Sequence, residues 1–313
     1  MRSEFTTTVF TILVVLLGTV LTGCFGQEPE PTEPGLRLAA DHEFIQSGLL
    51  QLQELYDLEF SEVHGMVIGL THEALRARDV DVAKGFTTDA KLVQLDLVCL
   101  EDDKGFFPAN NPALVVRQEV VEEYPEIPEL LEAISHRLDT PTMIHLNYQV
   151  DIEESEPEAV AKNWLREEGL LGEAASDPGA REPVVVSSKE FVEQEILGQL
   201  VIMALRSAGI PVEDRTDLGG TQANRTALLR GQVDLYWEYL GKAWHDVHHQ
   251  EEVISDPDEV FAQLVERDRE QGLVWLAYAP VNSTLSLMMC RQEADELGIR
   301  TISDLAEYAR TLK

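Results

Sequence analysis

Residues 184–198 read VVVSSKEFVEQEILG: a β-branched run, two serines and then an apolar-periodic segment. The run predicts a strand, and the periodicity predicts a helix after a short polar loop. Ser187 and Glu190 have the spacing of a capping box, which would place the helix start at this point. The stretch therefore has the pattern of an α/β opening, although it lies in mid-chain behind residues 172–183, a linker by its Pro and Gly content.

The same alternation of strand and helix patterns continues on both sides of this opening. Upstream, strand candidates such as LRLAA and EVHGMVIG alternate with helical segments, and VVRQEVVEEY is expected to be a helix. Downstream, paired glycines precede Thr221 as an expected N-cap, and VDLYWEY is an aromatic-rich strand candidate. The chain ends in TISDLAEYARTLK, a capped helix with no strand after it, which is unusual for an α/β unit.

The composition is strongly acidic. The formal net charge is -33, from 57 Asp and Glu against 24 Lys and Arg, and 44% of the residues are hydrophobic. Such a charge repels nucleic acid and anionic lipid, so neither is an expected partner. Two interpretations stay open: a merely soluble acidic surface, or adaptation to high salt, where repulsion between like charges is screened.

The N-terminus has the features of an export signal. Arg2 precedes an apolar run and then Leu21-Thr22-Gly23-Cys24, which resembles the lipobox of bacterial-type lipoproteins. We expect residues 1–23 to be a signal peptide, Cys24 to be acylated, and residues 24–35, rich in Pro and Glu, to be a tether. An uncleaved membrane helix is the alternative. The expected location is the cell envelope, on the outer face of the cytoplasmic membrane or in the periplasm.

Two further cysteines lie in strand-like apolar runs. Cys99 occurs in LDLVCLE and Cys290 in LSLMMCR. Both are expected to be small buried side chains. A disulfide between them stays possible in an oxidising compartment.

Several long stretches resemble one known family. They are FTTDAKLVQLDLVCLEDDKGFFP at residues 86–108, residues 147–150 and 157–171, SSKEFVEQEILG, LGGTQANRTALLRGQVDLYWEYLG and LVWLAYAPVNST. They are similar to osmoprotectant-binding proteins of ABC transporters, which bind glycine betaine, choline or carnitine. The resemblance implies an α/β, bilobal, periplasmic-binding-protein-like (type II) fold, in which two α/β lobes are joined by two crossing strands.

The order of the family's two halves is reversed in this chain. The segment that matches residues 184–313 comes first in the family, so the chain resembles a circular permutant whose ancestral ends are joined by residues 172–183. We expect residues 36–313 to form one bilobal domain, with one lobe made of residues 36–84 and 283–313 and the other of 85–282. The expected crossings are Asp79–Phe86 and Pro280–Leu287. Two separate half-domains that each need a partner chain are the alternative.

The resemblance also implies an aromatic cage for a quaternary ammonium group. Tyr239 matches a cage tyrosine, and Phe86 keeps an aromatic side chain at a second position. Leu285 and Asn110 stand where the family usually has aromatic residues. Tyr236, Trp237 and Tyr278 are candidates to rebuild the cage, or core residues.

Polar residues at matching loop and helix-start positions are candidates for the carboxylate end of a solute. These are Gln194, Ser188, Thr221, Asn282 and Thr87, and Asn110 is added as a pocket residue. Lys242 would place a positive charge near the pocket, or is a solvated lysine.

Histidines give a weaker signal. His245 and His249 are spaced by four residues, a spacing that metal ligands use, with His248 between them, but no second cluster completes a site. His72 is a candidate to approach the cleft, or a packed core residue. No metal or cofactor is expected.

The sequence thus predicts a solute-binding lipoprotein of an ABC importer that is not an enzyme. It would capture a betaine-like zwitterion or quaternary-ammonium solute between the lobes and deliver it to a permease subunit. The alternative is a ligand-sensing or regulatory lipoprotein with the same fold and no transport role.

Overall fold

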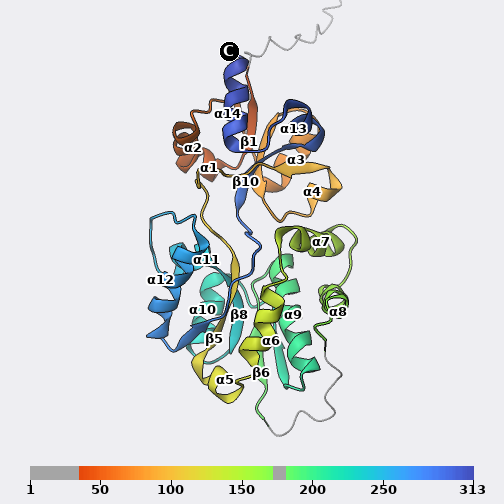
Figure 1. Ribbon diagram of the computed structural model, residues 1–313, viewed down its shortest axis with the longest axis vertical. Coiled ribbons are helices and arrows are strands. Elements are labelled where there is room, and N and C mark those ends of the chain that lie inside the picture. Colours follow the sequence, from red (N-terminus) through yellow and green to blue (C-terminus); the bar gives the residue numbers. More distant parts are fainter. Residues whose placement is uncertain (1–34, 172–180) are drawn as a thin grey trace, which may run out of the picture. The chain divides into compact units, whose positions relative to one another are not determined.

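The computed structural model describes residues 35–171 and 181–313, and Pro34–Lys313 form one compact unit. This unit contains two mixed five-stranded sheets flanked by helices (Figure 1). The predicted α/β architecture with two lobes is confirmed. No helix within the described residues is both long and apolar enough to cross a membrane. Cys24, the expected signal peptide and most of the expected tether lie outside the described residues.

The first sheet has the strand order β2-β1-β3-β10-β4. Its strands are β1 (Arg37–Ala40), β2 (Glu62–Gly65), β3 (Val82–Phe86), β4 (Leu97–Cys99) and β10 (Leu285–Cys290). The helices of this lobe are α1 (His42–Ser47), α2 (Leu49–Tyr56), α3 (Ile68–Arg76), α4 (Lys91–Gln94), α13 (Arg291–Leu297) and α14 (Ile302–Thr311). Two apolar clusters form the core of this lobe, one containing Leu38 and Leu287 and one containing Leu75 and Met288.

The second sheet has the order β7-β6-β8-β5-β9. Its strands are β5 (Pro112–Arg117), β6 (Val184–Ser187), β7 (Val212–Arg215), β8 (Leu235–Tyr239) and β9 (Leu273–Trp275). The helices of this lobe are α5 (Gln118–Glu123), α6 (Ile127–Ser135), α7 (Thr140–Asp151), α8 (Pro157–Glu167), α9 (Val192–Ser207), α10 (Thr221–Leu229), α11 (Leu240–Lys242), the π-helix η1 (Ala243–Val247) and α12 (Pro257–Arg269). The larger apolar cluster of this lobe surrounds α9, and a second one contains Tyr236 and Trp244.

The two sheets are built alike. In each, three strands run parallel, and a fourth, β10 or β5, pairs antiparallel with both of its neighbours. Each fourth strand reaches its sheet directly after the chain has crossed from the other lobe. The crossing segments are therefore residues 100–111, between β4 and β5, and 276–284, between β9 and β10.

These crossings correct the expected lobe boundaries. The predicted crossing at Asp79–Phe86 is wrong, because β3 pairs with β1 and β10 inside the first sheet. The first lobe continues past residue 84 through β4, and Leu100 and Phe107 still belong to its core. The predicted crossing Pro280–Leu287 overlaps the observed segment, but β10 begins at Leu285.

The opening at residues 184–198 folds as strand, loop and helix, but without the predicted capping box. The N-cap of α9 is Phe191, whose side chain makes no cap hydrogen bond. Ser187 is buried and donates to Asn224 Oδ1 at 2.7 Å, so its hydroxyl ties β6 to α10 instead. Gly220, not Thr221, is the N-cap of α10.

The segment VVRQEVVEEY is expected to be a helix, but its first three residues belong to a strand. Val115 and Val116 lie in β5, between β8 and β9, and have no exposed surface. Only from Gln118 does α5 begin. A short apolar run of this kind is ambiguous between strand and helix by periodicity alone.

The two ends of the described unit lie beside the same segment of the chain. Ser61 N donates to Leu36 O at 2.8 Å, and Lys313 forms an ion pair with Glu59. The final helix α14 is capped, as its sequence pattern predicts, and the cap is the capping box Thr301–Asp304. It packs on α2, and Arg310 pairs with Asp57 at 3.0 Å.

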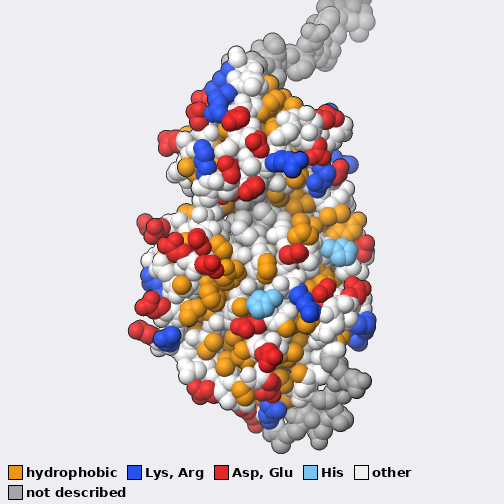
Figure 2. Space-filling model, viewed as in Figure 1, with side chains coloured by type: hydrophobic (Ala, Val, Ile, Leu, Met, Phe, Trp, Pro, Cys, Tyr) orange, Lys and Arg blue, Asp and Glu red, His pale blue; other side chains and the backbone are white. Residues whose placement is uncertain are grey.

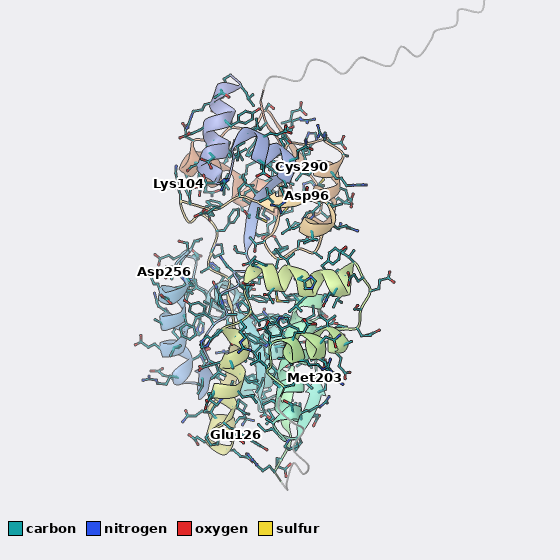
Figure 3. All side chains as sticks on the ribbon, turned by 45° about the vertical axis from the view of Figure 1, so that its right-hand side comes forward. Asp96, Lys104, Glu126, Met203, Asp256 and Cys290 are labelled. Carbon is teal, nitrogen blue, oxygen red and sulfur yellow. The ribbon has the colours of Figure 1, made fainter. Side chains whose placement is uncertain are left out.

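Both remaining cysteines lie on the pair β4–β10, and both are free thiols. Cys99 lies opposite Met288, and Cys290 lies opposite Leu97; Cys290 and Asp96 are labelled in Figure 3. The two cysteines are therefore diagonal neighbours, at a separation larger than a disulfide spans without backbone movement.

Candidate ligand-binding site

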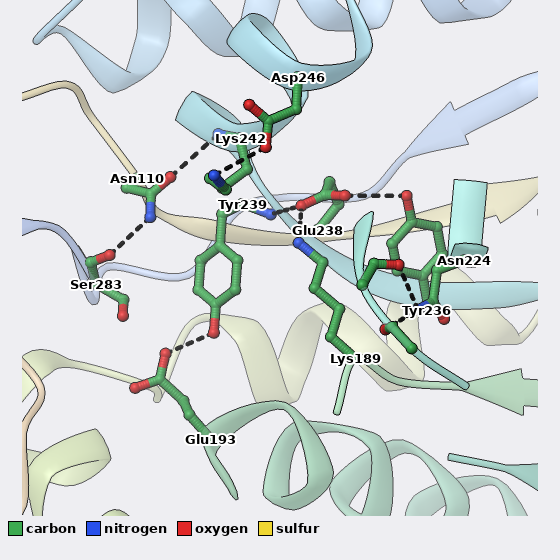
Figure 4. A network of polar contacts seen from close by, with 12 residues as sticks. Asn110, Lys189, Glu193, Asn224, Tyr236, Glu238, Tyr239, Lys242, Asp246 and Ser283 are labelled. Atoms are coloured by element: carbon green, nitrogen blue, oxygen red, sulfur yellow. Dashed lines mark hydrogen bonds and ion pairs between the residues drawn. The ribbon is translucent and has the colours of Figure 1, made fainter. Parts of the chain in front are cut away.

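Tyr239, the last residue of β8, is at the centre of a buried polar network (Figure 4). Its ring stacks on Phe191, with ring centroids 6.2 Å apart and planes 19° apart, and Lys189 Nζ lies 5.0 Å from its centroid. The hydroxyl donates to Glu193 Oε1 at 2.6 Å. Burial, followed by the charge of Glu193, raises the pKa of Tyr239 well above its ordinary value, so the hydroxyl stays a donor.

Lys189 and Glu238 form a buried ion pair next to this ring. Their side chains are 4% and 1% exposed. Glu238 also accepts from Tyr236 Oη at 3.1 Å and from the Tyr239 backbone N–H at 2.7 Å. The pair thus ties the loop after β6 to the end of β8, because a buried charge of this kind needs its partner.

A second set of bonds leads from Tyr239 toward the first lobe. Asn147, on α7, donates from Nδ2 to Glu193 Oε2 and to Thr88 O, each at 2.9 Å. Thr88 lies two residues after the end of β3 of the first sheet, and its hydroxyl lies 3.0 Å from Ser283 Oγ. Residues of both lobes therefore meet beside Tyr239.

Two amides in this region have unused hydrogen-bonding capacity. Gln194 has no exposed surface, yet neither its Oε1 nor its Nε2 has a partner, and Asn147 Oδ1 is also unpaired. The Gln194 amide acts to lower the pKa of the Tyr239 hydroxyl, but no hydrogen bond of acceptable geometry joins the two. Buried polar atoms normally have partners, so these unpaired atoms make Gln194 and Asn147 candidate ligand-binding residues.

Three other predicted site residues bind one another instead. Asn110 N donates to Asn282 Oδ1, and Asn110 Nδ2 donates to Ser283 O, each at 2.7 Å. Thr87 Oγ1 donates to Asn282 O at 2.6 Å. These residues join the two crossing segments to each other. The contact of Asn282 and Thr87 with a solute carboxylate stays a prediction.

Ser188, Thr221 and Lys242 are not brought together with Tyr239 and Gln194 by any hydrogen bond. Ser188 Oγ accepts from Asp217 N at 3.0 Å and donates to Lys189 O at 3.2 Å, which holds the loop after β6. Thr221 is half-buried at the start of α10. Lys242 is 52% exposed and pairs with Asp246 at 2.8 Å, the contact of a solvated helix lysine.

The candidate aromatic residues fall into an exposed group and a group that belongs to the core. Phe86, at the end of β3, is 43% exposed, and Phe191 is 45% exposed. Tyr236 and Trp237 are core residues, with Trp237 Nε1 bonded to Leu197 O at 3.0 Å, and Tyr278 binds Asp258 and packs against the second core cluster of its lobe. These three therefore lie in or against the core of their lobe, whereas Phe191 lies directly on Tyr239.

A separate hollow of about 890 Å³ lies along β4 and the crossing segments. It is bounded by both lobes, through Leu97 and Leu285 on one side and Thr140 and Ile144 on the other. It contains Thr87 and Asn282 but not Tyr239, Gln194 or Glu193. Its aromatic lining is confined to Phe107, so it offers no opposed faces for a quaternary ammonium group.

The histidines do not form a metal site in the part of the chain that is described, where no group of three or more His, Cys, Asp or Glu is placed to hold an ion. His248 Nε2 lies 3.1 Å from Asp268 Oδ1. Asp268 also accepts from Arg225 Nη1 and Trp275 Nε1, each at 2.7 Å, and these donors hold its pKa at about 2 against the opposing effect of burial. His72 is fully buried, and burial lowers its pKa.

The comparison with protein families agrees with this architecture. The model of the substrate binding domain of ABC-type glycine betaine transport systems matches residues 29–167 and 182–313. The chain belongs to this family. The match spans nearly all of the described residues, and its gap, residues 168–181, covers most of the linker at residues 172–183.

Individual relatives in the family match in part. The glycine-betaine-binding protein of Pseudomonas aeruginosa is 41% identical over 157 residues, 49% of this chain and 50% of that protein. The ergothioneine transport permease/ergothioneine binding protein of Helicobacter pylori is 38% identical over 119 residues, 38% of this chain and 22% of that protein. The chemotactic signal transduction system substrate-binding protein of Halobacterium salinarum is 29% identical over 132 residues, 41% of this chain and 40% of that protein. Each aligned region thus spans half or less of the curated relative.

The family description covers both halves of the described chain as a substrate binding domain. Sequence reasoning missed four residues of the Tyr239 network: Lys189, Phe191, Glu193 and Asn147. The signal was present, because the first three lie in SSKEFVEQEILG and Asn147 begins another family-like stretch. What the sequence does not contain is the meeting of β8, α9 and α7, which alone shows that these residues share one site.

Proposed function

We propose that this protein binds a betaine-like zwitterion between its lobes and delivers it to an ABC permease. The observation that carries the proposal is the Tyr239 site itself: a buried aromatic ring at the end of a strand, next to a carboxylate, with the unpaired amide of Gln194 and the unpaired Oδ1 of Asn147 in the same region. Opposed lobes of this kind close around a ligand through a hinge motion.

The cation of the solute would lie against aromatic faces. Tyr239 and Phe191, which stack on each other in the second lobe, would supply two of them, and Phe86, exposed at the end of β3, would supply one from the first. Each face contributes about 0.5–2 kcal/mol of cation–π attraction, depending on desolvation. Phe191 would replace one of the two cage aromatics that are absent at Leu285 and Asn110. The negative charge of the Glu193 carboxylate would favour the cation.

The other end of the solute would meet the Gln194 amide. Both amide atoms are buried and unpaired, so a carboxylate or hydroxyl of the solute would complete their bonds. The polar side chains Ser188, Thr87 and Asn282 already have protein partners. Their part in the proposal is to fix the loops around the site.

Calorimetric titration with glycine betaine, choline, carnitine, proline betaine and ectoine tests this function. Replacement of Tyr239 by Leu (Tyr239→Leu) should weaken binding of the preferred solute by roughly 5- to 30-fold, the equivalent of 1–2 kcal/mol. Tyr278→Leu is the matched control, because it removes an aromatic side chain of the same lobe that contacts Asp258 and not this site. Equal losses in the two variants would move the site away from Tyr239.

A sensing role is the second candidate, favoured by the partial match to the Halobacterium chemotactic protein. The two functions need the same solute site and differ in the partner that binds the protein when its lobes are closed around the solute. Pull-down with the permease or with a membrane signalling protein, in the presence and absence of the preferred solute, distinguishes them. Capture of a permease would favour transport, and capture of a signalling protein would favour sensing.

Two further parts of the proposal concern the chain outside the site. Cys24 would anchor the protein to the membrane by a lipid, and mass spectrometry of the mature N-terminus tests this. We also infer that the chain is a circular permutant of the family fold. Its support is the adjacency of Leu36 and Lys313, which both lie beside residues 59–61, since permutation requires neighbouring ends.

A further inference from the structure

A continuous path of hydrogen bonds runs from Tyr239 in the second lobe to the first lobe. It comprises Tyr239 Oη to Glu193 Oε1 at 2.6 Å, Asn147 Nδ2 to Glu193 Oε2 at 2.9 Å, and Asn147 Nδ2 to Thr88 O at 2.9 Å. All four residues are at most 6% exposed. The path is therefore shielded from water, where such bonds are worth more than at the surface.

Helix α7 carries the central residue of this path and contacts both lobes. Met143 and Leu146 belong to the core of the second lobe, whereas Ile144 packs against a core cluster of the first. Helix α4 of the first lobe also lies against α7. Separation of the lobes would therefore break the Asn147–Thr88 bond, while the bonds among Tyr239, Glu193 and Asn147 stay within one lobe.

This arrangement makes the orientation of the Tyr239 ring in the second lobe depend on the position of the first lobe. Glu193 uses one oxygen for Tyr239 and the other for Asn147, and the same Asn147 amide nitrogen serves Glu193 and Thr88. A shift of Asn147 away from Thr88 changes the donor that holds Glu193, and Glu193 in turn orients the Tyr239 ring.

We propose that Glu193 and Asn147 are positioning residues that couple the Tyr239 ring to closure of the lobes. They act through Tyr239 and Thr88, and neither needs to touch the solute. This inference rests on the proposed function for its effect on binding, but its effect on the lobes does not depend on any solute.

The first test measures the lobes alone. Spin labels at Gln51→Cys on α2 and Glu122→Cys on α5, both exposed positions, report the distance between the lobes in the full chain with Cys24→Ser, Cys99→Ser and Cys290→Ser. Pulsed dipolar spectroscopy of the ligand-free protein gives the distribution of this distance.

Asn147→Ala should shift this distribution toward longer distances, because the only group that joins Glu193 to Thr88 along this path is gone. Asn224→Ala is the control: Asn224 is equally buried and hydrogen-bonded, to Ser187, Gly219 and Gly220, but all its partners lie in the second lobe. A purely structural role for Asn147 would leave the distances of the two variants alike, and that result would overturn the proposal.

The second test measures solute release by stopped-flow fluorescence. Asn147→Ala and Glu193→Ala should each raise the dissociation rate of the preferred solute about tenfold, with a smaller change in the association rate. Because both residues act through one path, the dissociation rate of the double variant should rise by much less than about a hundredfold, the product of the two single effects. Independent, multiplying effects would overturn the coupling.

The two tests separate this inference from the proposed function. If the wild-type protein bound none of the solutes, the proposed function would be contradicted, and the distance distribution of Asn147→Ala would still decide the coupling. If the solute bound and the distances of Asn147→Ala matched those of Asn224→Ala, the coupling would fail while the function stood.

Discussion

The buried ion pair between Lys189 and Glu238 predicts a large and specific effect of Lys189→Met. Methionine keeps most of the apolar length of lysine but removes the ammonium, so the 1%-exposed carboxylate of Glu238 loses its counter-charge. Removing one partner of a buried pair costs about 3–5 kcal/mol. Glu238 retains the Tyr236 hydroxyl and the Tyr239 N–H as donors, which places the expected loss at the lower end, roughly 3 kcal/mol.

Urea unfolding followed by circular dichroism measures this loss, and a thermal melt should show a fall of roughly 6–12 °C. Lys242→Met is the matched control, because Lys242 is 52% exposed and its pair with Asp246 is solvated, where an ion pair is worth about 0–1 kcal/mol. The double variant Lys189→Met, Glu238→Gln should recover part of the loss. If Lys189→Met were as stable as Lys242→Met, the assignment of a desolvated pair next to Tyr239 would be refuted.

Three further outcomes are expected. The pKa of Asp268 lies at about 2, below its ordinary 3.8. The ionised Asp268 therefore stabilises the folded state fully above pH 3.8, and this stabilisation is lost as the pH falls through 2. Asp268→Asn should lower the free energy of unfolding at pH 7 and flatten the decline of that free energy below about pH 4. The melting temperature should rise between low and molar salt, because the net charge is -33, Asp and Glu side chains are spread over the face shown in Figure 2, and molar salt shortens the screening length to about 3 Å. A flat or falling melting temperature would contradict the high-salt adaptation. Cleavage at a protease site inserted between residues 172 and 183 should leave both fragments associated on a sizing column, because β5 and β10 each lie inside a sheet whose other four strands come from the other fragment. Free separation of the fragments would contradict the single domain.

The sequence predicts the fold well where local patterns and long family-like stretches agree. The strand at β8 and the cap of α14 are local signals, and they are confirmed. The lobe boundary was misplaced because β4 is only three residues long. Its membership of the first sheet depends on pairing with β10, which is nearly two hundred residues away along the chain.

The candidate site is predictable at the level of segments and not of atoms. Tyr239 and Gln194 were selected from matching positions, and the structure places both in one buried region. Asn110, Asn282 and Thr87 were selected by the same reasoning, yet they bond to one another across the crossing segments. A motif places a polar residue near a cleft, but whether its donors are free depends on partners from distant segments.

A crystal structure of the protein with glycine betaine bound tests the central claim most directly. The account predicts the trimethylammonium group within about 6 Å of the Tyr239 ring centroid, with Phe191 or Phe86 on another side and the Gln194 amide hydrogen-bonded to the solute. Density for the solute in the 890 Å³ hollow along β4 instead, with Tyr239 and Gln194 free of contact, would contradict it.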